Sequence, residues 1–134
     1  MSLNPKTSIA ARNLALNAIF DVLNTGGKLR LYDGVQPATV DTAMGAQVKL
    51  SEHALASTAY VAASGGTKTA AAIANGTGLA DSTATWYQLV KADGTTRVHE
   101  GSVGTSASDL VLDSVAIRTG ATVVISGLVH TMAA

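Results

Sequence analysis

Turns that contain glycine recur about every ten residues after residue 27 and divide most of the chain into short segments. Asp and Gly residues at such turns accommodate positive backbone φ angles that other residues disfavour. Short strands at this spacing are typical of a mainly β fold, here an antiparallel β-sandwich or barrel of jelly-roll or immunoglobulin-like type. The clearest turns are Asp33-Gly34, Ser64-Gly65-Gly66, Asp93-Gly94 and Thr119-Gly120.

Only one segment, at the N-terminal end, has a strong helical period. The pattern predicts a helix over residues 8–24, with Thr7-Ser8 as the N-cap and Gly26-Gly27 as a left-handed C-terminal stop. At about 100° per residue, one apolar face and one adjacent polar stripe emerge. The apolar face holds Ile9, Leu16, Ile19, Phe20 and Leu23, and the polar stripe holds Asn13, Asn17, Asp21 and Asn24.

The clearest strand covers Thr83–Ala92, and Asp93-Gly94 predicts a hairpin that returns along Arg97–Ser102. Adjacent strand residues point to opposite faces, so we expect Trp86 in the core and Tyr87 exposed. We expect Leu110–Ile117 and Ala121–Val129 to pair with each other through the turn at Thr119-Gly120. The other expected strands are Lys28–Tyr32, Gln47–Ser51, Ala59–Ala63 and Thr67–Ala74, although the alanines of the last also suit a helix.

A length of 134 residues and the absence of a composition shift indicate one domain. We expect it to span residues 8–134, preceded by an arm, residues 1–7, that contains Pro5 and becomes ordered on binding. The expected core residues are Leu16, Phe20, Leu29, Leu31, Trp86, Val90, Leu110, Leu112, Val123 and Ile125.

Charged residues make up only 13% of the chain, and the formal net charge is zero. Ala, Thr, Gly and Ser together account for 64 of the 134 residues. This balance gives no electrostatic reason to expect a nucleic-acid or membrane partner. A surface with few ions requires little desolvation and suits close packing against other chains. Composition therefore favours a homo-oligomer, a dimer or a trimer.

No pattern predicts catalytic chemistry, a metal or a cofactor. The chain has no cysteine, and His53, His99 and His130 lack metal-ligand spacing, so we expect each histidine at a surface or interface. Gly104–Ser108 only partly resembles a nucleophile elbow, which disfavours a hydrolase built on Ser106, His99 and an aspartate. Gly65–Lys68 lacks the glycine spacing of a phosphate-binding loop. The aspartates in predicted turns are expected to bond to their own backbone.

Three segments, taken in order, resemble a group of small virion proteins of tailed phages and prophages. They are AARNLALNAIFDVLNTGGKLRLYDGVQPATVDTA, ATWYQLVKADGTT and GSVGTSASDLVLDSVAIRTGATVVIS. The resemblance covers most of residues 8–127, and the order of the motifs is more specific than any one of them. It implies a β-sandwich virion protein made in the bacterial cytoplasm, namely a decoration or cement protein bound to the major capsid protein. It transfers no catalytic residue, and its turn motifs are architectural.

Two other functions stay open from the sequence. The chain could occupy the tail or neck and contact other virion proteins there. It could also be a carbohydrate- or receptor-binding module at a fibre, which requires exposed aromatic rings beside polar groups.

Overall fold

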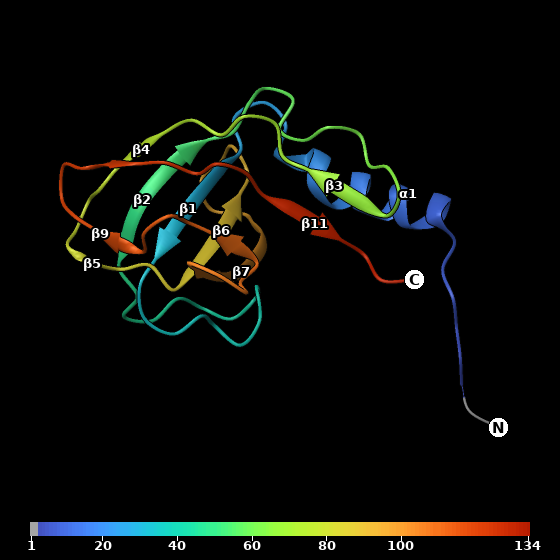
Figure 1. The fold of residues 1–134 in the computed structure, drawn as a ribbon, viewed down its shortest axis with the longest axis horizontal. Coiled ribbons are helices and arrows are strands. Elements are labelled where there is room, and N and C mark those ends of the chain that lie inside the picture. Colours follow the sequence, from blue (N-terminus) through green and yellow to red (C-terminus); the bar gives the residue numbers. More distant parts are fainter. Residues whose placement is uncertain (1–2) are drawn as a thin grey trace.

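The computed structural model describes residues 3–134, and a curved five-stranded sheet lies at its centre (Figure 1). The strand order is β2-β1-β6-β7-β8, and all neighbours are antiparallel except β7 and β8. The predicted mainly β class is therefore confirmed, in the form of a curled half-barrel. The strands are β1 (Lys28–Tyr32), β2 (Lys49–Ala54), β6 (Trp86–Val90), β7 (Arg97–Gly104) and β8 (Leu110–Val111).

Three short strand pairs complete the β structure. Two of them, β4 (Gly76–Thr77) with β10 (Thr122–Val123) and β5 (Ser82–Thr83) with β9 (Ala116–Ile117), lie at the end of the sheet far from the helix (Figure 1). The third pairs β3 (Thr67–Thr69) with β11 (Val129–Thr131). Strands predicted over longer ranges, such as residues 67–74, are therefore much shorter, and residues 59–63 contribute only an isolated bridge at Tyr60.

The predicted pairing of residues 110–117 with 121–129 is wrong. The turn itself forms, because Gly120 has φ +82° and the Ala121 amide donates to the Arg118 carbonyl. However, the segment around Gly78 and Asp81 bonds to both arms of this turn: the Gly120 amide donates to the Gly78 carbonyl, and the Thr119 amide to Asp81 Oδ1. The two arms therefore pair with β4 and β5 instead of with each other.

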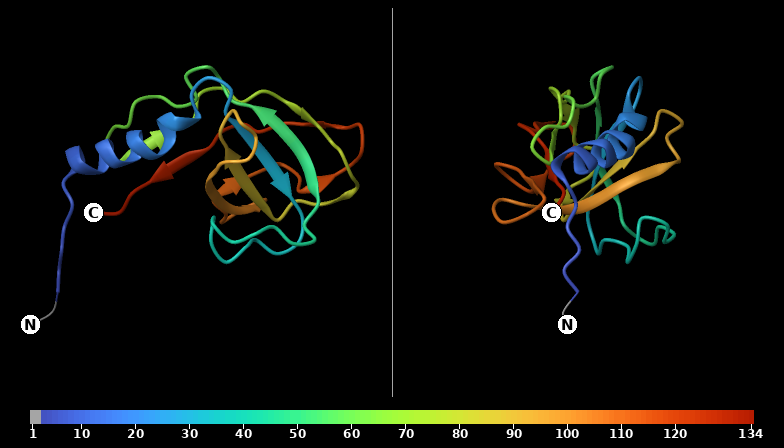
Figure 2. Two further views of the ribbon diagram at one scale, coloured as in Figure 1. Left: turned by 180° about the vertical axis from the view of Figure 1, so that it is seen from behind. Right: turned by 90° about the vertical axis from the view of Figure 1, so that its right-hand side faces the viewer.

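Helix α1 (Ile9–Phe20) continues into a short 3-10 turn (Asp21–Leu23) and packs on the β3–β11 ribbon. We call α1 together with the β3–β11 ribbon the helix–ribbon unit. Residues 24–128 other than β3 form what we call the body. Figures 1 and 2 show the unit projecting to one side of the body. Residues 3–8, which include the described part of the predicted arm, are exposed and extend away from the helix; residues 1 and 2 lie outside the described chain.

The helix differs from its prediction in two ways. Leu16, Phe20 and Leu23 are buried, but Ile9 and Ile19 are 54% and 40% exposed, because the buried stripe is narrower than the apolar face. The left-handed stop lies at Thr25 and Gly26, with φ of +58° and +103°, and does not include Gly27.

Gly27 has a different role from the one predicted. A Cβ at this position would lie 2.3 Å from the Leu23 carbonyl oxygen, so the close approach of the two backbones requires glycine.

The predicted hairpin at Asp93-Gly94 joins β6 to β7. Gly94 has φ +74°, and the Asp93 carboxylate accepts hydrogen bonds from the Thr95 and Thr96 amides. A hydrogen bond from the Thr96 hydroxyl, together with these two amide bonds, holds the pKa of Asp93 well below its ordinary value. Gly34 also has a positive φ, of +73°, but neighbouring Asp33 bonds to Val48 and Ser82 and not to its own turn.

The ten residues expected in the core are all buried, at 7% exposure or less. The expectation for Tyr87 is wrong, because every residue of β6 is buried on both faces. Trp86 stacks on Tyr32 on one face, and Tyr87 points into the joint with the helix–ribbon unit on the other.

Gly101 makes room for the buried Tyr87 ring, which lies directly opposite it in the β6–β7 register. A Cβ at residue 101 would come within 2.6 Å of the ring. We therefore expect Gly101→Ala to lower the free energy of unfolding by about 1–3 kcal/mol through overpacking, measured by urea denaturation. Gly127→Ala is the control, because its added Cβ meets nothing within 4 Å. Equal stability of the two variants would contradict this packing.

Candidate functional site

The polar stripe of α1 faces the ribbon and not the solvent. Asn13 Oδ1 accepts from the Gly66 amide at 2.9 Å, and Asn17 Oδ1 accepts from the Ala63 amide at 3.0 Å. Asn17 also accepts from Lys68 Nζ at 2.6 Å. The helix therefore docks by satisfying backbone amides of the segment before β3, which a sequence period alone does not reveal.

A buried lysine strengthens this docking. Lys68, on β3, is 1% exposed and its Nζ lies 2.8 Å from Asp21 Oδ1 at the end of the helix. At the other end, Arg12 Nη1 donates to the Met132 carbonyl at 3.2 Å. Polar bonds at both ends thus hold α1 on the ribbon and fix the position of the whole unit.

A cleft of about 420 Å³ lies where the helix–ribbon unit meets the body. The second half of α1 and the edge of β11 form one side, and β6, β7 and the residue before β8 form the other. Its lining combines apolar side chains with two histidines and a carboxylate: Leu16, Ile19, Phe20, Tyr87, His99, Asp109, Val129, His130, Thr131, Met132 and Ala133.

Stacked rings form the floor of the cleft. The Phe20 and His130 rings are stacked with centroids 4.0 Å apart, and Tyr60 lies 5.1 Å from Phe20 on another side. His99 approaches both Phe20 and His130 edge-on, at 5.3 and 4.7 Å. The edge-on contacts of His99 with Phe20 and His130 stabilise beyond the area they bury, so this ring cluster joins the unit to the body.

All three histidines lie inside the protein and not at the surface as expected, because each has a polar partner there. His130 Nε2 is 2.9 Å from the Tyr60 hydroxyl, and His99 Nε2 is 3.1 Å from the Tyr87 hydroxyl. His53, on β2, lies between Ser51 Oγ and the Ala74 carbonyl, both at 2.9 Å. His53 and His130 are buried, and His99 is half-buried.

Burial sets the ionisation of the ring cluster. It lowers the pKa of His99 and, together with the neighbouring His99, lowers the pKa of His130 to about 3. Burial raises the pKa of the Tyr60 and Tyr87 hydroxyls above their ordinary range. The histidines are therefore neutral at pH 7 and serve as packing and hydrogen-bonding groups.

Asp109 is the one carboxylate that lines the cleft. Its Oδ2 accepts from the Ser102 amide at 2.9 Å and from the Ser102 hydroxyl at 3.0 Å. The hydrogen bond from the Ser102 backbone amide is the main cause of the lowered pKa of Asp109. The side chain is exposed, and it makes no ion pair with any residue of 3–134. The cleft thus presents a negative charge beside apolar walls.

The geometry does not assemble the disfavoured serine hydrolase. Ser106 lies exposed in the turn after β7, where its carbonyl accepts from Ser108 Oγ. His99 Nε2 is already bonded to the Tyr87 hydroxyl, and no serine hydroxyl of residues 3–134 bonds to it. Nucleophilic catalysis needs a hydroxyl bonded to its base, so the cleft is better suited to binding an apolar or cationic group.

The solvent-facing side of α1 is apolar. Leu14 is 71% and Val22, in the following turn, 44% exposed, and Ala11 and Ala18 are exposed between them. The only charged residue of α1, Arg12, lies on another side and bonds to Met132. A helix that is apolar on its solvent side as well as on its buried side is typical of a helix covered by another chain.

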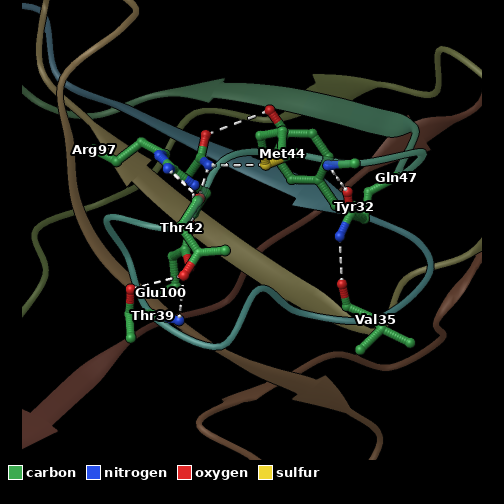
Figure 3. A network of polar contacts seen from close by, with 10 residues as sticks. Tyr32, Val35, Thr39, Thr42, Met44, Gln47, Arg97 and Glu100 are labelled. Atoms are coloured by element: carbon green, nitrogen blue, oxygen red, sulfur yellow. Dashed lines mark hydrogen bonds and ion pairs between the residues drawn. The ribbon is translucent and has the colours of Figure 1, made fainter.

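The loop after β1 is held over the opposite face of the sheet by a polar network (Figure 3). Gln88 Nε2 donates to Glu100 Oε2 at 3.2 Å and contacts Met44 Sδ at 3.7 Å. Arg97 bonds to Glu100 and to the Thr42 carbonyl. The network joins loop residues Thr42 and Met44 to side chains of the sheet and so fixes the position of the loop.

Sequence analysis places two of the residues that line the cleft, Leu16 and Phe20, in the core but does not predict the cleft itself. Asp109 and the C-terminal residues 129–133 receive no predicted role in a site. One local signal does exist: in Val129-His130-Thr131 a polar ring alternates with two smaller residues, which indicates an inward-facing histidine on an edge strand.

Within residues 3–134, no three or more histidine, cysteine, aspartate or glutamate side chains form a group that could hold a metal ion. None of the helices in this part of the chain has the length and apolar character needed to cross a bilayer.

No protein-family model matches this sequence, no curated protein is significantly similar to it, and no solved structure matches its fold.

Lys68→Met tests the docking of the helix. Asn17 loses one donor and Asp21 loses its ion pair, so we expect the free energy of unfolding to fall by about 1–3 kcal/mol in urea denaturation. Lys91→Met is the control, because Lys91 is exposed and makes no ion pair within the described chain; it should change stability by less than about 0.5 kcal/mol. A loss no larger than that of the control would contradict the role of Lys68.

The burial of the three histidines predicts that the stability of the protein depends on pH. The folded state disfavours protonated His99, His130 and His53, whereas the unfolded chain protonates them near pH 6.5. Below that pH the unfolded state binds more protons, so stability falls; the contribution of His130 approaches about 1.4 kcal/mol per pH unit, and His99 and His53 add to the slope in the same direction. Above about pH 7.5 these residues contribute no slope.

Urea denaturation between pH 7.5 and 5 measures this slope, above the range in which the carboxylates titrate. His130→Phe keeps a ring against Phe20 but removes one titrating group, so its slope should be smaller by about one histidine. An unchanged slope in this variant would show that His130 is not buried in its neutral form.

Proposed function

We propose that this chain is a non-enzymatic structural subunit of a tailed-phage virion, which binds the outer surface of the capsid shell and stabilises it. The observation that carries the proposal is the apolar outer side of α1 and the turn after it, which projects from the body with Leu14 and Val22 exposed. The ordered motifs that resemble phage and prophage virion proteins supply the class of particle. The protein would be made in the bacterial cytoplasm and act in the virion.

The physical character of the chain supports this role. A protein that covers many equivalent positions on a lattice needs a surface that loses little hydration free energy on contact. With 13% charged residues and no net charge, neighbouring copies do not repel one another strongly. Weak contacts repeated over a shell then add up through multivalency, without any chemical step. The subunit would act as a dimer or trimer.

The alternative carbohydrate-binding function finds less support. Stacking on sugar rings requires exposed aromatic side chains, but all five of this chain, Phe20, Tyr32, Tyr60, Trp86 and Tyr87, are at most 7% exposed. A place in the tail or neck would use the same apolar helix, so the binding experiment below includes tails as well as heads.

We expect the purified protein to bind, to saturation, to heads of the encoding phage prepared without it, as measured by co-sedimentation. Leu14→Glu should weaken this binding at least tenfold, equivalent to about 1.4 kcal/mol, because it buries a charge in the contact. Val35→Glu is the matched control, since Val35 is 80% exposed in the loop between β1 and β2, on the body. Binding to tails alone would move the site to the tail, and no binding to either would refute the proposal.

A further inference from the structure

One edge of β11 has open backbone hydrogen-bonding groups. The Ala70 amide donates to the Leu128 carbonyl, and the Met132 amide donates to the Gly66 carbonyl. Because antiparallel pairs alternate, His130 is then the hydrogen-bonded partner of Lys68, and the amides and carbonyls of Val129 and Thr131 point away from β3. The described chain offers these outward groups no partner.

A groove runs along this open edge. The cleft beside the ring cluster and a neighbouring hollow of about 330 Å³ share Val129 and Asp109, so the two lie end to end beside β11. Val111 and Leu128 add apolar surface to the second part. A groove with an open strand edge, apolar walls and two carboxylates, Asp109 and Asp113, is suited to an extended peptide that adds as a strand and carries a cation.

We propose that residues 3–7 of a second copy of this chain occupy this groove and add as a strand to the open edge of β11. The inference deepens the proposed function, since it rests on the chain being a subunit that assembles. Residues 3–7, Leu3-Asn4-Pro5-Lys6-Thr7, are exposed and extended, and their backbones bond to no other part of residues 3–134. We call them the arm.

The arm matches the groove in hydrogen bonding. Pro5 has no amide hydrogen, so its nitrogen must face away from β11, and Asn4 and Lys6 must then face towards it. Asn4 and Lys6 are two positions apart, as are Val129 and Thr131. Their backbone groups can therefore form hydrogen bonds with the open amides and carbonyls of both residues of β11.

The arm also matches the groove in charge and apolarity. Leu3 is 94% exposed and supplies an apolar side chain for the walls. Lys6 makes no ion pair within the described chain, and neither does Asp109 of the groove. Placing the arm along β11 brings these two opposite charges to the same site.

A second copy is favoured over the same chain by the direction of the arm. Ser8 caps α1 with its hydroxyl accepting from the Ala11 amide, and its extended backbone directs the arm away from the helix–ribbon unit (Figures 1 and 2). The zero net charge allows two copies to approach without long-range repulsion. Reciprocal exchange of arms gives a closed, symmetric dimer, and sequential exchange gives a closed ring.

The test is the molar mass in solution, by sedimentation or light scattering, of two complementary variants. One variant lacks residues 1–7 and keeps the groove. The other, Thr131→Pro, keeps the arm but removes the outward amide of β11 without removing a β3–β11 hydrogen bond. We expect each variant to be monomeric at concentrations at which the natural chain is an oligomer, and an equimolar mixture of the two to form a heteromer.

Lys6→Glu provides a variant that cannot unfold the body, because Lys6 is exposed and lies outside every helix and strand. It should weaken assembly at least tenfold, whereas Lys91→Glu, with the same charge change at the exposed residue that follows β6, should not. Far-ultraviolet circular dichroism and thermal melting check that Thr131→Pro is folded; if it is not, Lys6→Glu against Lys91→Glu decides.

The inference is overturned by a natural chain that is monomeric at about 100 µM, by an oligomer that survives removal of residues 1–7, or by equal effects of the two Lys→Glu variants. It is also overturned by complementary variants that fold but fail to associate when mixed, which would place the arm on its own chain. Head binding is scored separately through Leu14→Glu. A persisting oligomer without the arm therefore leaves the shell-binding proposal intact, and absent head binding leaves arm exchange intact.

Discussion

The stacking of Phe20 on His130 is the contact on which the rest of the arrangement depends. Phe20 comes from the last turn of α1 and His130 from β11, and the edges of His99 and the ring of Tyr60 close around them. This chain has only five aromatic residues, and three of them, with two histidines, are gathered in this joint. Because the rings fix the unit against β7, they also set the distance between the edge of β11 and Asp109, and so the shape of the groove.

The scarcity of charge has a structural counterpart in how polar groups are used. Asn13, Asn17 and Lys68 bond between the helix, the ribbon and the segment before β3, where they satisfy backbone amides or one another. The solvent side of α1 is left to Leu14, Val22 and alanines. This distribution is the reverse of that in an ordinary surface helix, whose polar side faces water. This distribution is expected if another protein surface, and not water, covers that side of the helix in the assembled state. For this reason we connect it with binding to a shell.

The two proposed contacts use separate parts of the unit. The outer side of α1 would meet the shell, while the open edge of β11 would receive the arm of another copy. In a ribbon of two strands, each strand has one edge whose backbone groups lack a partner unless another segment covers it. Here residues 60–64 bond to the outer edge of β3, and the outer edge of β11 stays open. The same geometry that leaves the unit short of partners within one chain supplies the surfaces for assembly.

The sequence by itself determined the elements whose partners are close along the chain. The helix, the strand Lys28–Tyr32 and the hairpin at Asp93-Gly94 depend on local periodicity, capping and turn preference, which each segment carries within itself. Only the tertiary structure decided the pairing of the two- and three-residue strands. Partners such as Thr77 and Thr122 are far apart in sequence, and strands so short carry almost no pattern. It alone also decided the cleft, because Phe20, His99, Asp109 and His130 meet through contacts between distant segments, and no local preference encodes such contacts.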